Sequence, residues 1–154
     1  MDVDVTNRPE LRVGALRHVG PYQQIGEAFG RLGAIAGGAG LFNHQGAAML
    51  AIYYDDPDST PSDQLRSDAA IAVPDGVALP GELVEQRVPG GRYARTLHLG
   101  SYESLPETWK RFKTEGLKAV GGRSAKGPSY EVYVNNPMTV PKEELRTELY
   151  IPLT

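Results

Sequence analysis

The sequence predicts an α+β fold made from a tandem pseudo-two-fold repeat of a βαββ-type unit, with an antiparallel sheet and two main helices. The first observation behind this prediction is that the chain aligns with itself at a fixed offset of 80 residues, so that His18-Val19-Gly20-Pro21-Tyr22 falls on His98-Leu99-Gly100-Ser101-Tyr102. The second is that each copy has one helix-type segment among strand-type segments. Repetition at a fixed period constrains a fold more than any single motif. A ligand groove is expected on the axis that relates the two copies.

The first copy begins with two strand-type segments, residues 3–6 and 11–19, which we expect to form a hairpin around Asn7-Arg8-Pro9. Gly20-Pro21 ends the second segment, and the next apolar residues recur at helical spacing: Ile25, Phe29, Leu32 and Ala36. The glycines at 37, 38 and 40 favour the end of this helix. Strands are predicted at residues 48–54 and 68–73, separated by a proline-rich loop.

The second copy repeats this order. Residues 83–87 and 92–98 flank Pro89-Gly90-Gly91, so a second hairpin is predicted there. A helix should follow from about Tyr102, with Ser101 as its N-cap and with its buried face marked by Leu105, Trp109, Phe112 and Gly116. Strands at 130–134 and 148–153 close the copy. We expect residues 1–154 to form one domain of two repeats, about 1–74 and 81–154, which share a core.

Composition narrows the classes of function. A net charge of −3 and an isoelectric point near 5.6 argue against a nucleic-acid-binding surface, which needs clustered Lys and Arg. The absence of cysteine excludes disulfides, thiolate metal sites and cysteine nucleophiles. The three histidines lack metal-site spacing, so neither a metal nor another cofactor is expected. Without a long apolar run or a leader-like start, the chain is expected to act in the cytoplasm, away from membranes.

Glu131 is the strongest candidate for a functional side chain. Strand alternation places Glu131 and Tyr133 on one face, and the residue equivalent to Glu131 in the first copy is Ala51. A single carboxylate among aromatic groups suits binding of a cation, or general-base chemistry where it is desolvated. The alternative is a solvent-facing glutamate on a half-exposed sheet.

Four aromatic residues are predicted to line the same ligand site. Trp109 has two expected roles, which can both hold. It would fill the core under the second helix, and it would stack on a flat ligand at the edge of the cleft. Tyr22, Tyr53 and Tyr133 belong to tyrosine pairs that the repeat relates, and they suit a pocket for amphipathic ligands. Tyr133 has the most weight because it shares a face with Glu131, where aromatic faces and a carboxylate would together bind a cation.

Several segments resemble the GyrI-like family, also called the SbmC or DNA gyrase inhibitor family. They are Ala51-Ile52-Tyr53-Tyr54-Asp55-Asp56-Pro57-Asp58-Ser59-Thr60-Pro61, Leu65-Arg66-Ser67-Asp68, Val19-Gly20-Pro21-Tyr22 and Tyr130-Glu131-Val132-Tyr133-Val134-Asn135-Asn136. The resemblance covers essentially the whole chain and is to the stand-alone members, without the helix-turn-helix of related regulators. It implies a cleft between the repeats that binds bulky aromatic or cationic molecules. The family's cleft glutamate maps onto Glu131, and its aromatic residue on the second helix maps onto Trp109.

The resemblance leaves three functions open. The first is binding of a drug or toxin as protection against it. The second is hydrolysis of cyclopropane-bearing genotoxins, with Glu131 as the general base. The third is inhibition of DNA gyrase by protein contact, which rests on the family name alone. Direct nucleic-acid binding is not expected.

Overall fold

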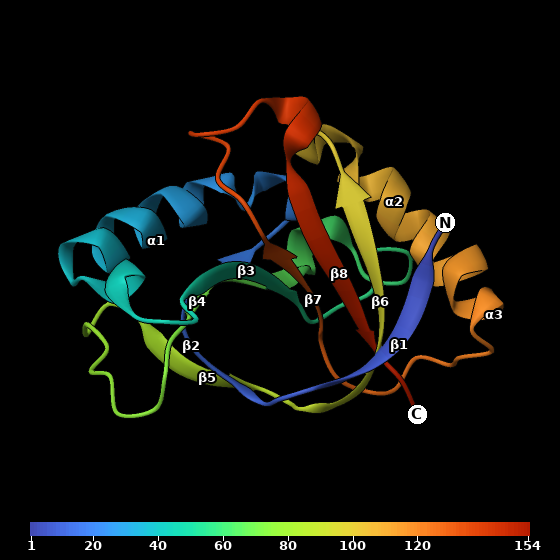
Figure 1. The fold of residues 1–154 in the computed structure, drawn as a ribbon, viewed down its shortest axis with the longest axis horizontal. Helices are drawn as coiled ribbons and strands as arrows, with labels where there is room; N and C mark the ends of the chain where they lie inside the picture. The colour runs from blue at the N-terminus through green and yellow to red at the C-terminus, as the bar shows by residue number, and fades with distance from the viewer. The chain divides into compact units, whose positions relative to one another are not determined.

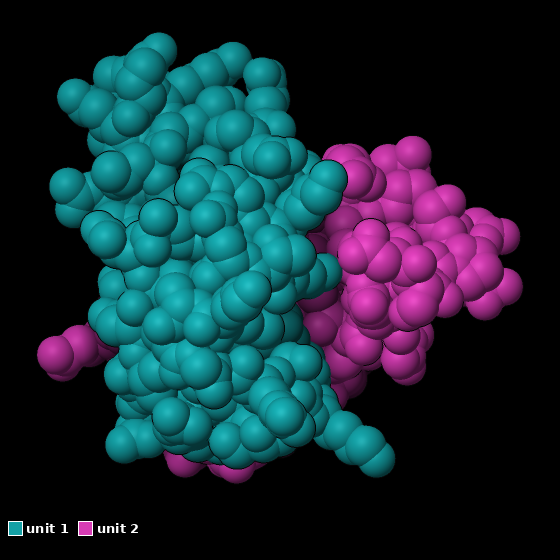
Figure 2. Space-filling view, turned by 90° about the vertical axis from the view of Figure 1, so that its right-hand side faces the viewer, with its two compact units in different colours: residues 1–9, 90–154 teal, residues 10–89 magenta.

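The computed structural model describes all 154 residues and confirms the predicted class, an α+β fold with antiparallel strands and two main helices (Figure 1). The chain divides into two compact units. Unit 1 contains residues 1–9 and 90–154, and unit 2 contains residues 10–89; Figure 2 colours them teal and magenta. Each unit is built around the βαββ-type order that the repeat predicts. No helix is long and apolar enough to cross a membrane.

Unit 2 is a four-stranded antiparallel sheet with one helix. Its elements are β2 (Leu11–Val19), α1 (Gly26–Gly38), β3 (Ala48–Tyr53), β4 (Arg66–Ala72) and β5 (Val84–Val88). The strand order is β3-β4-β2-β5, and α1 packs against β2 and β4. The helix buries Ala28, Leu32 and Ala36, so the predicted apolar face is the buried one. Gly40 follows with φ +71°, a left-handed conformation that glycine adopts without strain.

Unit 1 has the same plan with a different helix. Its elements are β1 (Val3–Arg8), β6 (Gly91–Leu99), α2 (Leu105–Arg111), α3 (Leu117–Ala119), β7 (Ser129–Tyr133) and β8 (Arg146–Pro152). The strand order is β1-β6-β8-β7. The predicted second helix is interrupted by a π-helical turn, Phe112–Gly116, between α2 and α3. Its core joins the helix to the sheet through Ala94, Leu105, Phe112, Leu149, Ile151 and Leu153.

Both predicted hairpins are wrong, because each first strand pairs with the other copy. β1 pairs with β6, with Val3 opposite Thr96, and β5 pairs with β2, with Val88 opposite Leu11. The chain passes from one unit to the other between Pro9 and Glu10 and again between Pro89 and Gly90. A two-residue hairpin loop requires a positive φ at its first central residue, whereas proline holds φ near −65°. Pro9 and Pro89 therefore disfavour a hairpin turn, and at both positions the chain continues into the other unit.

Candidate functional site

Glu131 lies in the middle of β7, opposite Leu149 of β8, and is only 2% exposed. The alternative of a solvent-facing glutamate is therefore wrong. Tyr130, the preceding residue, is also fully buried, because both faces of β7 are covered. Alternation along the strand puts Glu131 on the face of Leu149, which packs under α2, and Tyr130 on the opposite face.

Two neutral donors bind the Glu131 carboxylate. The indole Nε1–H of Trp109 donates to Oε1 at 2.8 Å, and the hydroxyl of Tyr133 donates to Oε2 at 2.9 Å. Hydrogen bonds to an ionised acceptor are stronger than those between neutral groups, so both donors stabilise the charged carboxylate. The structure thus brings Glu131, Trp109 and Tyr133 together in unit 1, in agreement with the predicted face of the strand.

Aromatic rings surround this carboxylate. The ring of Trp109 lies 5.9 Å from that of Phe112, between ring centroids, and the ring of Tyr133 lies 5.4 Å from that of Tyr102. Burial, and secondarily the negative charge of Glu131, raises the pKa of the Tyr102 hydroxyl above its ordinary value. The sequence prediction did not assign Tyr102 to the site, although the repeat aligns it with Tyr22.

Tyr22 and Tyr53 form the corresponding pair in unit 2. Their ring centroids are 4.7 Å apart. The Tyr22 hydroxyl donates to the carbonyl oxygen of Asp55 at 2.7 Å and accepts from its N–H at 3.0 Å, which fixes the ring. Burial raises the pKa of Tyr22. That this pair completes one ligand site with Glu131 stays a prediction.

A buried histidine fixes the start of the helix that carries Trp109. His98 of β6 is 5% exposed, and its Nδ1 lies 2.7 Å from the hydroxyl oxygen of Thr108. Its Nε2 lies 2.9 Å from the carbonyl oxygen of Ser101, whose own hydroxyl accepts from the N–H of Glu103. Ser101 caps the 3₁₀ turn before α2, close to its predicted place. His98 therefore positions the residue next to Trp109 and belongs to the support of the site.

The opposite face of the unit 1 sheet is closed by a cationic aromatic cluster. The guanidinium of Arg8 lies 4.3 Å from the centre of the Tyr150 ring, and its Nε donates to the Tyr130 hydroxyl at 3.0 Å. Tyr93 packs edge-on against both tyrosines. These contacts attach β1 to β7 and β8 and leave the helix-facing side for Glu131.

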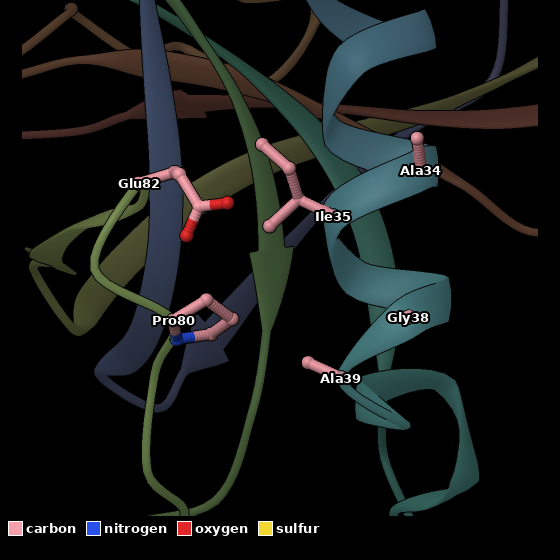
Figure 3. A pocket seen from close by; sticks show the side chains of 6 residues that line it. All are labelled: Ala34, Ile35, Gly38, Ala39, Pro80 and Glu82. Carbon is pink, nitrogen blue, oxygen red and sulfur yellow. The ribbon is translucent and has the colours of Figure 1, made fainter.

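A surface hollow of about 410 Å³ lies elsewhere, in unit 2 (Figure 3). It is lined by Ala34, Ile35, Gly38, Ala39, Pro80 and Glu82, and the Glu82 carboxylate points toward Ile35. None of the predicted site residues lines it, and its one charged side chain is exposed. No group of three or more His, Asp or Glu side chains is placed to hold a metal ion.

Curated relatives cover nearly the whole chain. A protein of Yersinia enterocolitica named DNA gyrase inhibitor is 28% identical over 141 residues, which are 88% of each chain. One of Dickeya dadantii named DNA gyrase inhibitor 2 is 33% identical over 131 residues, covering 82% of this chain and 80% of the relative.

Solved structures with low identity share the fold. The C-terminal domain of EcmrR matches with a TM-score of 0.74 at 18% identity, over 99% of this chain and 97% of that one. The protein SAV2435 bound to tetraphenylphosphonium gives 0.74 at 13% identity, over 100% and 94%. A hydrolase from Listeria innocua gives 0.67 at 16%, over 99% and 91%.

The family model described as the GyrI-like small molecule binding domain matches residues 1–154. The matched range includes both copies of the repeat and every residue of the Glu131 cluster. This chain therefore belongs to the GyrI-like family of small-molecule-binding domains.

Proposed function

We propose that this protein binds bulky, aromatic, cationic molecules at the Glu131 face and protects the cytoplasm from toxic compounds of that class. The observation that carries the proposal is a 2%-exposed carboxylate held by an indole N–H and a phenol O–H among aromatic rings. Glu131, Trp109 and Tyr133 would bind the cation in unit 1, and Tyr22 and Tyr53 are the further ligand-binding residues that we propose, in unit 2.

The physical chemistry of the cluster favours a cation with low charge density. A buried carboxylate has lost most of its hydration, and a ligand cation restores favourable electrostatics at close range. A small, strongly hydrated ion loses more by entering such a site than a large aromatic cation does, and aromatic faces add cation–π attraction. The structural neighbour with tetraphenylphosphonium bound carries a ligand of this class, which supports the proposal by analogy of fold.

The test is calorimetric titration of tetraphenylphosphonium into the wild type, Glu131→Gln and Glu82→Gln. Glutamine preserves the size of residue 131 and removes its charge, so affinity should fall at least about tenfold, the equivalent of one ordinary charged hydrogen bond. Glu82→Gln removes an exposed carboxylate of unit 2 that is not part of the cluster, and it should bind as the wild type does. Equal affinity of wild type and Glu131→Gln would contradict the proposal.

Hydrolysis is the alternative that the same carboxylate favours, and one structural neighbour is called a hydrolase. Glu131 would take a proton from water while the water oxygen attacks a carbon of a strained cyclopropane. The carbon–carbon bond breaks, the departing part of the toxin keeps its electron pair, and the proton held by Glu131 is then returned to that part. General-base assistance contributes about 10²–10⁴-fold. Mass spectrometry of a cyclopropane-bearing alkylating toxin after incubation should then show a product heavier by one water. Stoichiometric binding without that product would exclude turnover of the compound.

Inhibition of DNA gyrase is a third function, suggested by the names of relatives that cover most of this chain. It predicts that the purified protein slows supercoiling of relaxed plasmid in proportion to its concentration. An unchanged supercoiling rate at saturating protein would exclude it.

A further inference from the structure

Thr147 of β8 has a buried hydroxyl without a partner. Its side chain is 0% exposed, and its Oγ1 makes no hydrogen bond. Most buried polar side-chain atoms are hydrogen-bonded, and an unpaired buried hydroxyl destabilises the folded state. Valine would fill the same space without this cost, so packing alone does not explain a threonine at this position.

The strand register places this hydroxyl on the face that carries Glu131. Thr147 lies directly opposite Tyr133 of β7 and His98 of β6, and two residues along β8 from Leu149, the partner of Glu131. Residues two apart on a strand share a face, so Thr147 and Glu131 are diagonal neighbours.

The other donors of this face are already engaged. Trp109 and Tyr133 donate to Glu131, and both ring nitrogens of His98 have oxygen neighbours within 2.9 Å. The Thr147 hydroxyl has no such partner. It is therefore available to donate a hydrogen bond to an acceptor atom of a ligand bound beside Glu131.

The ring of Tyr102 lies against that of Tyr133, beside this region. Tyr102 belongs to a three-residue 3₁₀ turn, Tyr102–Ser104, and no hydrogen bond holds its hydroxyl. Its equivalent, Tyr22, is fixed to Asp55 by two hydrogen bonds. Tyr22 belongs to a three-residue 3₁₀ turn as well, so the hydrogen bonds at Tyr22 are what make the Tyr102 ring the easier of the two to displace.

We infer that Thr147 is a specificity-determining residue that donates a hydrogen bond to an acceptor oxygen of the ligand, once the ligand has displaced Tyr102. The inference rests on the proposed function, in which Glu131 binds the cation. It narrows the ligand class to flat aromatic cations that carry a carbonyl, ester or ether oxygen near the positive charge. Cations without an acceptor bind by charge and stacking alone.

Ser67 provides a matched control within the chain. It occupies the equivalent position in β4, is 0% exposed, and its hydroxyl also makes no hydrogen bond. Its strand neighbour Tyr53 packs against the fixed Tyr22, and Ala51 stands where unit 1 has Glu131. Ser67→Ala therefore removes a buried unpaired hydroxyl without removing a donor beside the carboxylate.

The experiment compares two probes by fluorescence or calorimetric titration: tetraphenylphosphonium, which has no acceptor atom, and rhodamine 6G, a flat cation with an ester. Thr147→Val should weaken rhodamine 6G about three- to tenfold, the usual net effect of one hydrogen bond, and change tetraphenylphosphonium less than twofold. Thr147→Ser, which keeps the hydroxyl, and Ser67→Ala should retain the discrimination of the wild type. Thr147→Val should also melt at or above the wild-type temperature.

Equal changes for both probes in Thr147→Val, or no change for either, would overturn the inference. A lower melting temperature for Thr147→Val than for Ser67→Ala would overturn it too, because the hydroxyl would then serve the fold. Glu131→Gln is measured in parallel to distinguish failure of this inference from failure of the proposed function. If Glu131→Gln binds both probes as tightly as the wild type does, the proposal that Glu131 binds the cation is wrong. Weaker binding of both probes by Glu131→Gln, with an indiscriminate Thr147→Val, would reject only the role of Thr147.

Discussion

At Glu131, an indole N–H and a phenol O–H take over part of the hydration that a carboxylate loses on burial. Neither of these two donors carries charge. In the proposed function, the same carboxylate also binds the ligand cation. Each donor contributes one hydrogen bond to the carboxylate, so a single substitution can remove it.

Trp109→Phe should destabilise the protein by about 1–3 kcal/mol, since it removes one donor from a buried carboxylate and keeps an aromatic ring. Phenylalanine is tolerated at the equivalent position of the first copy, where Phe29 stands. Urea unfolding followed by circular dichroism measures the change. An unfolding free energy equal to that of the wild type would show that the N–H is not needed.

Tyr133→Phe should lower the free energy of unfolding by a similar amount, because it removes the second donor to Glu131. Tyr102→Phe is the control, since the Tyr102 hydroxyl makes no hydrogen bond, and its effect should stay within about 0.5 kcal/mol. Equal losses in the two variants would contradict the assigned role of the Tyr133 hydroxyl.

Sequence alone predicts much of this cluster and misses the rest for a physical reason. Strand alternation is a local property, so Glu131 and Tyr133 are correctly placed on one face. The bond from Trp109 depends on how closely α2 packs on β7, which no periodicity records. The role of His98 depends likewise on the hydroxyl of Thr108 at the start of another element.

At the scale of elements, the π-helical turn Phe112–Gly116 distinguishes the second helix from α1. A Cβ at Gly116 would lie 3.0 Å from Cδ1 of Phe112 and 3.1 Å from Cγ2 of Val3. Phe112 in turn packs on Trp109, so β1, the turn and the indole form one packed series. Turns of this kind are frequent at functional sites.

Gly116→Ala should destabilise the protein by about 1–2 kcal/mol, because overpacking outweighs the gain in helix propensity. Gly30→Ala in α1 is the matched substitution: its Cβ meets no atom within 4 Å, and it should stabilise by up to about 1 kcal/mol. Thermal and urea unfolding of both variants provide the comparison. A stabilised Gly116→Ala would mean that Phe112 and Val3 relax freely.

Strand positions were well predicted from the sequence, whereas strand partners were not. Alternating apolar residues mark β1, β2, β5 and β6 but contain no information on which strand lies beside which. The prolines at 9 and 89 were the available signal against hairpins, since their fixed φ disfavours tight turns between β-strands.

At the scale of the whole molecule, buried tyrosines make stability depend on alkaline pH. Burial raises the pKa of Tyr93 to about 12, and it also raises the pKa values of Tyr130 and Tyr150. In the unfolded chain these hydroxyls ionise near pH 10, so between about pH 10 and 12 the unfolded state holds fewer protons than the folded state. Their stabilising contribution is complete below pH 10 and is lost as pH rises.

The free energy of unfolding should therefore fall by about 1–2 kcal/mol between pH 9.5 and 11.5, as measured by urea titrations across that range. Tyr93→Phe removes one of the titrating groups and should make the fall shallower. A stability that stays flat to pH 11.5 would contradict the assignment.

The reciprocal pairing of β1 with β6 and of β5 with β2 has a consequence for how such a chain can arise. In a protein made of one copy, the first strand would not pair with the second strand of the same molecule. It would pair with the second strand of another molecule, so two molecules would exchange their first strands. Such an ancestor would be an intertwined homodimer. Gene duplication and fusion would then convert that dimer into one polypeptide and free the two halves to diverge, as a glutamate in one copy and an alanine in the other illustrate.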